Sequence, residues 1–230
     1  MLNLAKKSHF LQELVIDVIS SIHPSIEHNI DKIHILKKAF FHCELEEIEG
    51  GYFEFGTYEG TSLYAAVQNY RKLKSKIPRK FYGYDSFDDG FKYFNENDRH
   101  PFFKEGDFVS SYEKVKNRFR KFDEITLTKG YVEETIGGKN VTEMYKEEKC
   151  AIVFIDCDLM GPAIIALEFL KPILQQGSVI ILDDYWAYKG DPTRGTCGAL
   201  NTFLEDNPNI KVREYYTYGH GGKSFIVSQV

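Results

Sequence analysis

Short apolar runs alternate with helical patterns along most of the chain, and this alternation constrains the fold more than any other feature. The runs VFI at 153–155 and VIIL at 179–182 are typical of strands that are buried on both faces of a sheet. Between such runs, apolar residues recur at spacings of three and four, which indicates helices. Strands that alternate with helices form a parallel sheet with helices on both faces, so we predict an α/β fold.

The expected sheet is mostly parallel. Its seven strands are predicted at 51–56, 80–85, 124–130, 151–156, 177–184, 210–218 and 223–230. Helices are predicted at 61–76, 111–122 and 163–174, and within 193–208. Only the turn at 219–223 separates the last two strands, so they must form an antiparallel hairpin. We therefore predict a Rossmann-like sheet with one antiparallel strand near an edge.

The first 45 residues have a helical pattern, in which Pro24 separates two amphipathic segments. We expect residues 1–48 to form an N-terminal helical cap or extension, and residues 49–230 to form the main domain. Asp17 interrupts the first apolar segment and no small-residue cleavage site follows it, so this segment is predicted to be a helix and not a signal peptide. The N-terminal helices are expected to form either this cap or the dimer surface of a homo-oligomer.

Composition places the chain among soluble globular proteins, because 43% of its 230 residues are hydrophobic and 27% are charged. The net charge of −5, with no basic stripe, argues against a nucleic-acid partner. No apolar run has the length of a transmembrane helix, so no membrane insertion is expected. Cys43, Cys150, Cys157 and Cys197 form no C-x-x-C motif, so we expect free thiols and a reducing compartment, the cytoplasm.

Acidic residues stand at or near the ends of four predicted strands: Glu54, Asp85, Asp156 and the pair Asp183 and Asp184. In open parallel sheets, ligands bind beyond the carboxyl ends of the strands. A carboxylate beside an apolar core is costly unless something offsets its charge. The sequence therefore predicts a site at this edge of the sheet, with ligands that carry positive charge.

The loop FEFGTYEGTS joins the first strand to its helix and carries Gly56 and Gly60. It lacks the G-x-G-x-x-G spacing and the Lys-Ser/Thr pair that seat phosphates. Glu54 and Glu59 would repel a pyrophosphate and attract an ammonium group, which favours S-adenosylmethionine as the cofactor. Asp85, one strand away, is placed to accept the ribose hydroxyls of an adenosine. The alternative is a plain tight turn, with Asp85 as a turn-forming residue.

The carboxylates after the next two strands can meet at one point. Neighbouring strands lie about 4.8 Å apart, so Asp156, Asp183 and Asp184 can converge. Their repulsion would raise their pKa values unless a cation lies among them. Oxygen ligands without Cys or His favour a hard divalent ion, so we predict Mg²⁺ held by these three residues. Helix capping is the alternative, and Asp158 is suited to cap the helix near Pro162.

Taken together, these motifs resemble the macrocin-type O-methyltransferase family over about residues 50–206. The resemblance rests on FEFGTYEGTS, GYDSFDDGF, KGYVEETI, FIDCDL and VIILDDYW followed by ALNTFL. It implies a class I S-adenosylmethionine-dependent methyltransferase that methylates sugar hydroxyls of glycosylated natural products, with a metal at Asp156, Asp183 and Asp184. The implied cofactor contacts are Glu54, Gly56, Gly60, Ser62, Asp85, Ser86, Tyr131 and Val132, and the predicted site also includes Thr57, Tyr58, Thr61 and Asp156.

Two departures from the family pattern lie near the predicted site. Many family members carry a basic residue where this chain has Glu59, and a Tyr-Glu-Ser/Thr run where this chain has Met160, Gly161 and Pro162. The acceptor is therefore left open among sugars of a capsule, a lipopolysaccharide or a secondary metabolite. The loop at about 86–110 is expected to cover this acceptor.

Methyl transfer requires a hydroxyl that is aligned with the sulfonium methyl group and loses its proton. Mg²⁺ would lower the pKa of that hydroxyl. Asp156 is the first candidate for the base and Asp158 the second, while His220 in the GHGG turn is a third. Metal-dependent catechol enzymes carry a lysine base where this chain has Leu159, so that base is excluded here.

Two alternatives compete with this function. Asp156 and Asp158 form a D-x-D motif, which in a glycosyltransferase holds a divalent ion under a nucleotide diphosphate. The acidic first loop and the second acid pair argue against that reading. The other alternative is a non-catalytic binding protein on the same fold, which is disfavoured because an acid cluster without a function would only destabilise the protein.

Overall fold

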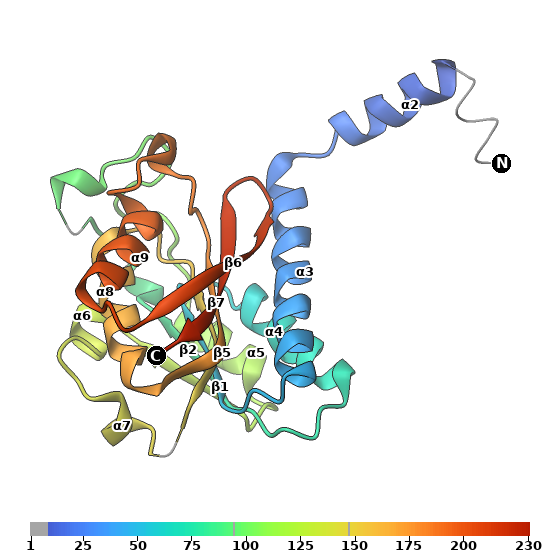
Figure 1. Ribbon diagram of the computed structural model, residues 1–230. Helices are drawn as coiled ribbons and strands as arrows, with labels where there is room; N and C mark the ends of the chain where they lie inside the picture. The colour runs from blue at the N-terminus through green and yellow to red at the C-terminus, as the bar shows by residue number, and fades with distance from the viewer. Residues whose placement is uncertain (1–8, 94, 147) are drawn as a thin grey trace.

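The computed structural model describes residues 9–93, 95–146 and 148–230 of the protein. Its centre is a seven-stranded sheet in the order β3-β2-β1-β4-β5-β7-β6 (Figure 1). The strands are β1 (Gly51–Phe55), β2 (Phe81–Asp85), β3 (Ile125–Lys129), β4 (Cys150–Ile155), β5 (Leu174–Leu182), β6 (Lys211–Tyr218) and β7 (Gly222–Gln229). Strands β1 to β5 pair in parallel, whereas β7 runs antiparallel to β5 and β6. This confirms the predicted sheet with one reversed strand and its terminal hairpin.

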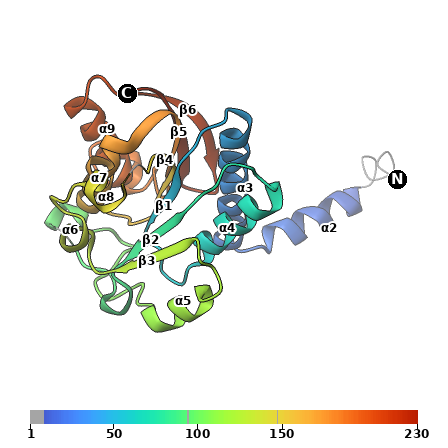
Figure 2. The ribbon, with the colours of Figure 1, turned by 90° about the horizontal axis from the view of Figure 1, so that it is seen from below.

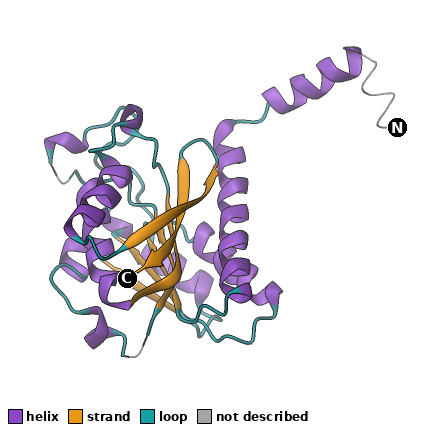
Figure 3. Ribbon diagram, in the orientation of Figure 1, coloured by secondary structure: helices purple, strands orange, loops and turns teal. Residues whose placement is uncertain are grey.

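Helices cover both faces of the sheet (Figures 2 and 3). One face carries α3 (Pro24–Leu45), α4 (Thr61–Leu73) and α5 (Tyr112–Phe119), and the other carries α6 (Val132–Thr135), α7 (Val141–Met144), α8 (Met160–Leu170) and α9 (Gly195–Asp206). Strand β4 serves both layers, because Val153 and Ile155 pack toward α8 while Ile152 and Phe154 pack toward α3 and α4. All four side chains are fully buried, as predicted for a strand covered on both faces.

The N-terminal segment consists of α2 (His9–Ser20) and α3, with the predicted break before Pro24. Pro24 opens α3 because the first turn of a helix needs no N–H from it. The His23 side chain caps the helix by accepting the Ser25 N–H at 3.2 Å. Helix α2 has no buried residue and projects from the body (Figure 1).

The second half of α3 belongs to the core of the main domain. Its residues Ile35, Leu36, Ala39, Phe40 and Cys43 are buried in the same apolar cluster as residues of α4, β1 and β4. The predicted domain boundary after residue 48 stays a prediction, but α3 packs as an integral helix of the layer that covers the sheet.

Some element boundaries differ from the predictions. Helix α8 begins at Met160, before the predicted 163, and β5 begins at Leu174, where the ladder with β4 shifts its register after Cys150. The short helices α6 and α7 were not predicted, because one helical turn is too short to show a periodic pattern. The same holds for the 3-10 turns η1 (Phe87–Asp89), η2 (Glu96–Asp98), η3 (Lys171–Ile173) and η4 (Tyr188–Gly190).

Candidate active site

A cavity of about 400 Å³ opens beyond the carboxyl ends of the parallel strands. Gly56 after β1, Asp85 at the end of β2, Asp156 after β4 and Asp183 after β5 all line it. The volume lies within the range of small-molecule sites. Apart from Glu54, the acidic strand ends predicted from the sequence therefore meet at one cavity, as expected for an open parallel sheet.

The loop after β1 lies directly on the loop after β4. Gly56 has a φ of +94°, and a Cβ atom there would lie 1.9 Å from the carbonyl oxygen of Asp156. Only glycine fits such a position, because both the left-handed backbone and the close approach exclude a side chain. Gly60, with a φ of +77°, stands at the N-cap of α4. The two glycines of the first loop thus serve the tight turn that brings its backbone to the cavity.

Glu54 lies beneath this loop and not in the cavity. Its side chain is fully buried and accepts hydrogen bonds from the hydroxyl of Tyr52 and from Ser62 Oγ, the latter at 3.0 Å. Burial raises the pKa of Glu54 to about 7, although both hydroxyl donors favour the charged form. Glu54 is therefore a buried carboxyl that takes up a proton near neutral pH and supports the loop after β1 from below.

Asp85 joins the loops after β1 and β2. Its carboxylate accepts the backbone N–H of Tyr58 at 2.8 Å and that of Phe87 at 2.5 Å. Burial raises the pKa of Asp85 above its usual value, although these N–H donors oppose the shift. A carboxylate has about four acceptor sites, so Asp85 can act as a turn residue and still accept hydroxyl groups from the cavity.

The predicted cofactor residues fall into two groups. Gly56, Tyr58, Asp85, Ser86, Tyr131, Val132 and Asp156 line the cavity. Glu54, Thr57, Gly60, Thr61 and Ser62 do not line it. Two members of the second group support the lining residues: Ser62 donates to Glu54, and the Thr57 hydroxyl donates to the carbonyl of Tyr84 at 3.4 Å.

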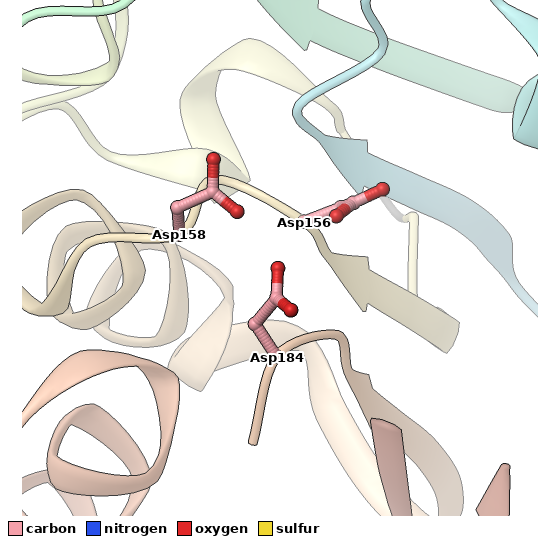
Figure 4. A group of neighbouring side chains, drawn as sticks. All are labelled: Asp156, Asp158 and Asp184. Carbon is pink, nitrogen blue, oxygen red and sulfur yellow. The ribbon is translucent and has the colours of Figure 1, made fainter. Parts of the chain in front are cut away.

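Three carboxylates converge where β4 and β5 end. Asp156, Asp158 and Asp184 each offer one oxygen atom, and these atoms all lie within 4.8 Å of one another (Figure 4). Both Asp158 and Asp184 have a left-handed backbone, with φ values of 61° and 49°. Burial, and then the neighbouring carboxylates, raise the pKa values of all three residues. Such a cluster could hold a cation, which would remove the mutual repulsion.

Asp183 has other partners than the sequence led us to expect. Its Oδ2 atom lies 3.1 Å from His28 Nε2 and 2.8 Å from Lys32 Nζ, and its Oδ1 atom accepts the Tyr218 hydroxyl at 2.6 Å. Although burial alone would raise it, Lys32 and His28 hold the pKa of Asp183 well below its usual range. Both oxygens of Asp183 are therefore satisfied by the protein, whereas Asp158 takes a place in the cluster that could bind a cation.

Helix α3 supplies residues to the cavity that sequence analysis missed. Ser25, His28, Asn29 and Lys32 line it, and Lys32 also pairs with Asp156 at 2.9 Å. Although burial opposes it, the two aspartates hold the pKa of Lys32 above its usual value, so the ammonium stays charged. Neither acid motif contains a basic residue, as predicted, but the fold brings one from outside them.

The loop at 86–110 contributes aromatic residues to the cavity. Phe91, Phe102, Phe103 and Phe108 line it. The rings of His220 and His28 also line the cavity, with their centroids 4.2 Å apart and their planes tilted by 36°. The cavity therefore combines carboxylates with aromatic side chains, as small-molecule sites commonly do.

The structure also bears on thiols and membranes. All four cysteines are free, and Cys43, Cys150 and Cys197 are buried. Within the described residues, no helix combines the length and the apolar character needed to cross a bilayer.

The sheet order, the reversed β7 and the cavity beyond β1 and β4 define the class I methyltransferase fold, and solved structures agree. The calicheamicin methyltransferase CalS11 is 21% identical, with a TM-score of 0.68 over 98% of this chain and 89% of that one. The O-methyltransferase NovP is 15% identical, with a TM-score of 0.67 over 90% and 89%. The S-adenosylhomocysteine-bound methyltransferase PaMTH1 of Podospora anserina is 14% identical, with a TM-score of 0.51 over 97% of each chain.

A family comparison identifies the chain more closely. The family model described as Macrocin-O-methyltransferase (TylF) matches residues 27–199, so the chain belongs to this family. The protein is an O-methyltransferase that uses S-adenosylmethionine as the methyl donor. The match begins within α3 and therefore includes both His28 and Lys32. No curated protein matches the chain.

Proposed function

We propose that the protein transfers the methyl group of S-adenosylmethionine to a hydroxyl group of a sugar or of a glycosylated acceptor. The observation that carries this proposal is one cavity that brings Asp85, Tyr131 and Val132 together with the acid cluster and with aromatic residues of the loop at 86–110. The family match supports an O-methyl product, and the structure of CalS11 belongs to a TDP-rhamnose 3'-O-methyltransferase.

For the cofactor, we propose an adenosine end beside Asp85 and an amino-acid end at the first loop. The free lone pairs of Asp85 would accept the ribose hydroxyls. Tyr131 and Val132 would lie against the adenine, and the backbone at Gly56 would meet the amino-acid end. An ammonium group near this loop would favour the charged form of Glu54, which lies directly below.

For the chemistry, the acceptor hydroxyl must lie in line with the sulfonium methyl group and give up its proton. Asp156 and Asp158 both line the cavity. Burial raises the pKa values of both carboxyls above the usual value, which favours the uptake of a proton. Asp156 is the proposed base, and Asp158 is the second candidate.

A hard divalent cation such as Mg²⁺ fits the carboxylates of Asp156, Asp158 and Asp184. The donors are all oxygen, they converge within 4.8 Å, and their mutual repulsion is relieved by a cation. Such an ion would lower the pKa of an acceptor hydroxyl bound to it. Asp183, which the sequence analysis included in this set, would stand behind the ion and hold α3 through Lys32 and His28.

Ligand binding separates this function from its alternatives. In calorimetric titrations, the protein should bind S-adenosylhomocysteine at micromolar or better affinity and should not bind a nucleotide sugar in its place. Binding of the nucleotide sugar alone would favour a D-x-D glycosyltransferase, and binding of neither ligand would favour a non-catalytic protein. The Asp85→Ala variant should lose most of the S-adenosylhomocysteine binding, because it removes the proposed ribose contact.

We also propose a homodimer through a surface that we call the α2/α3 surface. Thirteen of the exposed large apolar side chains belong to it: Phe10, Leu11, Leu14, Val15, Ile16, Val18, Ile19, Ile22, Ile26, Ile30, Ile33, Phe41 and Leu45. At about half exposure each, they present on the order of 1,000 Å² of apolar area in total along the two helices, which is close to one side of a standard interface. An isolated helix as short as α2 is also marginal in water, so it needs a partner.

Charge favours a second copy over a membrane as that partner. Helix α2 contains Glu13 and Asp17 and no Lys or Arg, so it would be repelled by an anionic lipid surface. Sedimentation velocity tests the proposal: the wild type should be a dimer, Val18→Asp with Ile30→Asp should be a monomer, and Met144→Asp on α7 should stay a dimer. A monomeric wild type contradicts it.

We also propose a reducing compartment, the cytoplasm, because three buried thiols are free.

A further inference from the structure

Lys32 brings a positive charge into the acid cluster from a helix that lies outside both strand ends. Its Nζ atom lies 2.9 Å from Oδ2 of Asp156 and 2.8 Å from Oδ2 of Asp183. Only 14% of the side chain is exposed, and it lines the cavity. The ammonium therefore occupies a position beside the proposed cation site, and it shares one ligand, Asp156, with that site.

The ammonium divides the four carboxylates into two sets. Asp183 is satisfied on both oxygens by Lys32, His28 and Tyr218. Asp156 gives one oxygen to Lys32 and keeps the other. In the described part of the chain, Asp158 and Asp184 form no ion pair with a basic residue, so the negative charge that is not offset lies on their side of the cluster.

We propose that Lys32 is a positioning residue that acts as a resident cation: it holds Asp156 and Asp183 when no divalent ion is bound, and it competes with a divalent ion for the cluster. The inference rests on the cation site of the proposed function. Two positive charges a few ångströms apart repel each other strongly in a buried site. Lys32 therefore keeps the metal-free protein folded around its carboxylates, and it weakens the binding of a divalent ion.

The simpler reading is that the ion pair only attaches α3 to the sheet. Under that reading, a change at Lys32 affects stability and leaves the affinity for a divalent ion unchanged in a folded variant. Cation affinity therefore distinguishes the two readings, whereas stability or activity alone does not.

The test measures Mn²⁺ binding by electron paramagnetic resonance, because the signal of free Mn²⁺ gives its concentration directly. The key comparison is between Asp183→Asn and the double variant Asp183→Asn with Lys32→Met, because the two proteins differ only in the ammonium and neither leaves the Asp183 carboxylate buried without its partner. Lys32→Met alone is measured as well, Lys32→Arg preserves the charge, and Lys37→Met changes an exposed lysine on the same helix. Circular dichroism checks that each variant is folded.

The double variant should bind Mn²⁺ roughly tenfold more tightly than Asp183→Asn alone, or more, because a neighbouring like charge has been removed. Lys32→Arg and Lys37→Met should bind as the wild type does. Detectable binding by the double variant with none by Asp183→Asn also supports the proposal. Binding by the folded double variant that equals or falls below that of Asp183→Asn, or no binding by any variant, overturns it.

A parallel titration with S-adenosylhomocysteine keeps this inference apart from the proposed function. If S-adenosylhomocysteine binds but the Mn²⁺ affinity does not change when Lys32 is replaced, the resident-cation role fails and the methyltransferase assignment stands. If Mn²⁺ affinity responds as expected while the ligand does not bind, the role of Lys32 stands and the proposed function fails.

Discussion

The backbone of Gly56 rests on the carbonyl oxygen of Asp156, so closely that a Cβ atom on Gly56 would lie 1.9 Å from that oxygen. This contact joins the loop after β1, which is the proposed cofactor loop, to the first residue of the acid cluster. The cofactor and the proposed base are therefore positioned by one shared backbone contact. A change in one loop must displace the other.

Gly56→Ala tests this contact. The added methyl group both clashes with Asp156 and takes a left-handed φ, so the variant should lose on the order of 2–4 kcal/mol of stability and most of its affinity for S-adenosylhomocysteine. Gly106→Ala is the control, because Gly106 has a similar φ of +82° but open space around a Cβ atom. Thermal unfolding of the control should show a loss of only about 1 kcal/mol. Equal losses in the two variants would mean that the close approach is unimportant.

Asp85→Ala should weaken the binding of S-adenosylhomocysteine by roughly tenfold or more, which is about 1.4 kcal/mol. The variant loses the acceptor of the ribose hydroxyls and also the bonds that tie the N–H groups of Tyr58 and Phe87. Asp88→Ala, which removes an exposed carboxylate paired with Lys129, is the control and should bind as the wild type does. Calorimetry gives both affinities. Unchanged binding by Asp85→Ala would leave Asp85 as a turn residue only.

Glu54 should make the stability of the cofactor-free protein depend on pH. Its pKa of about 7 in the folded protein lies above the ordinary value of 4.5. Between these values the native state holds more protons than the unfolded state, so stability should fall as pH rises from about 4.5 through about 7, by on the order of 3 kcal/mol. Glu54→Gln should remove that part of the slope, and Glu59→Gln should not. Denaturant unfolding measured across this range checks the sign, and an unchanged slope in Glu54→Gln contradicts it.

Asp183 and Asp184 should respond in opposite ways when no divalent ion is present. Asp183→Asn disrupts the contacts with Lys32, His28 and Tyr218, so it should cost roughly 3–5 kcal/mol with or without Mg²⁺. Asp184→Asn removes a carboxylate whose pKa is raised by burial and by Asp183, so it should be neutral or stabilising in EDTA.

With Mg²⁺ present, Asp184→Asn should be less stable than the wild type, because it has lost a proposed ligand of the ion. Thermal unfolding in EDTA and in Mg²⁺ gives all four values. If Asp184→Asn destabilises the protein equally in both solutions, Asp184 acts as a hydrogen-bond acceptor and the proposed cation site is wrong.

Most of the fold could be predicted from the sequence, because its signals are local. The apolar runs around Phe154 and Ile181 define strands, and the short turn before β7 requires a hairpin. The meeting of Asp156 with Asp183 follows from adjacent parallel strands and is confirmed by the pairing of β4 with β5. What could not be predicted was that Asp158 lies beside Asp156 and Asp184 while Asp183 pairs with Lys32 and His28, since this arrangement depends on left-handed turns at Asp158 and Asp184.

Lys32 and His28 were missed for a different reason. Polar residues on a helix are usually solvated, so the pattern predicts that Ser25, His28 and Lys32 belong to a solvent-exposed face. They lie on the same helical stripe as the buried Leu36 and Phe40, which face the sheet. When one stripe of a helix is apolar at one end and polar at the other, the apolar end packs in the core and the polar end lines a site. This pattern was present in the sequence of α3.

The central claim, methyl transfer to a sugar hydroxyl, is tested most directly by following the methyl group itself. The protein is incubated with S-adenosylmethionine labelled with carbon-13 on its methyl group and with a panel of glycosides, and the products are examined by NMR. The account predicts a labelled methoxy group on a sugar carbon, formed by the wild type and lost in Asp156→Asn. Label on nitrogen or carbon, or a cofactor that binds but transfers its methyl group to no glycoside in the panel, would contradict it.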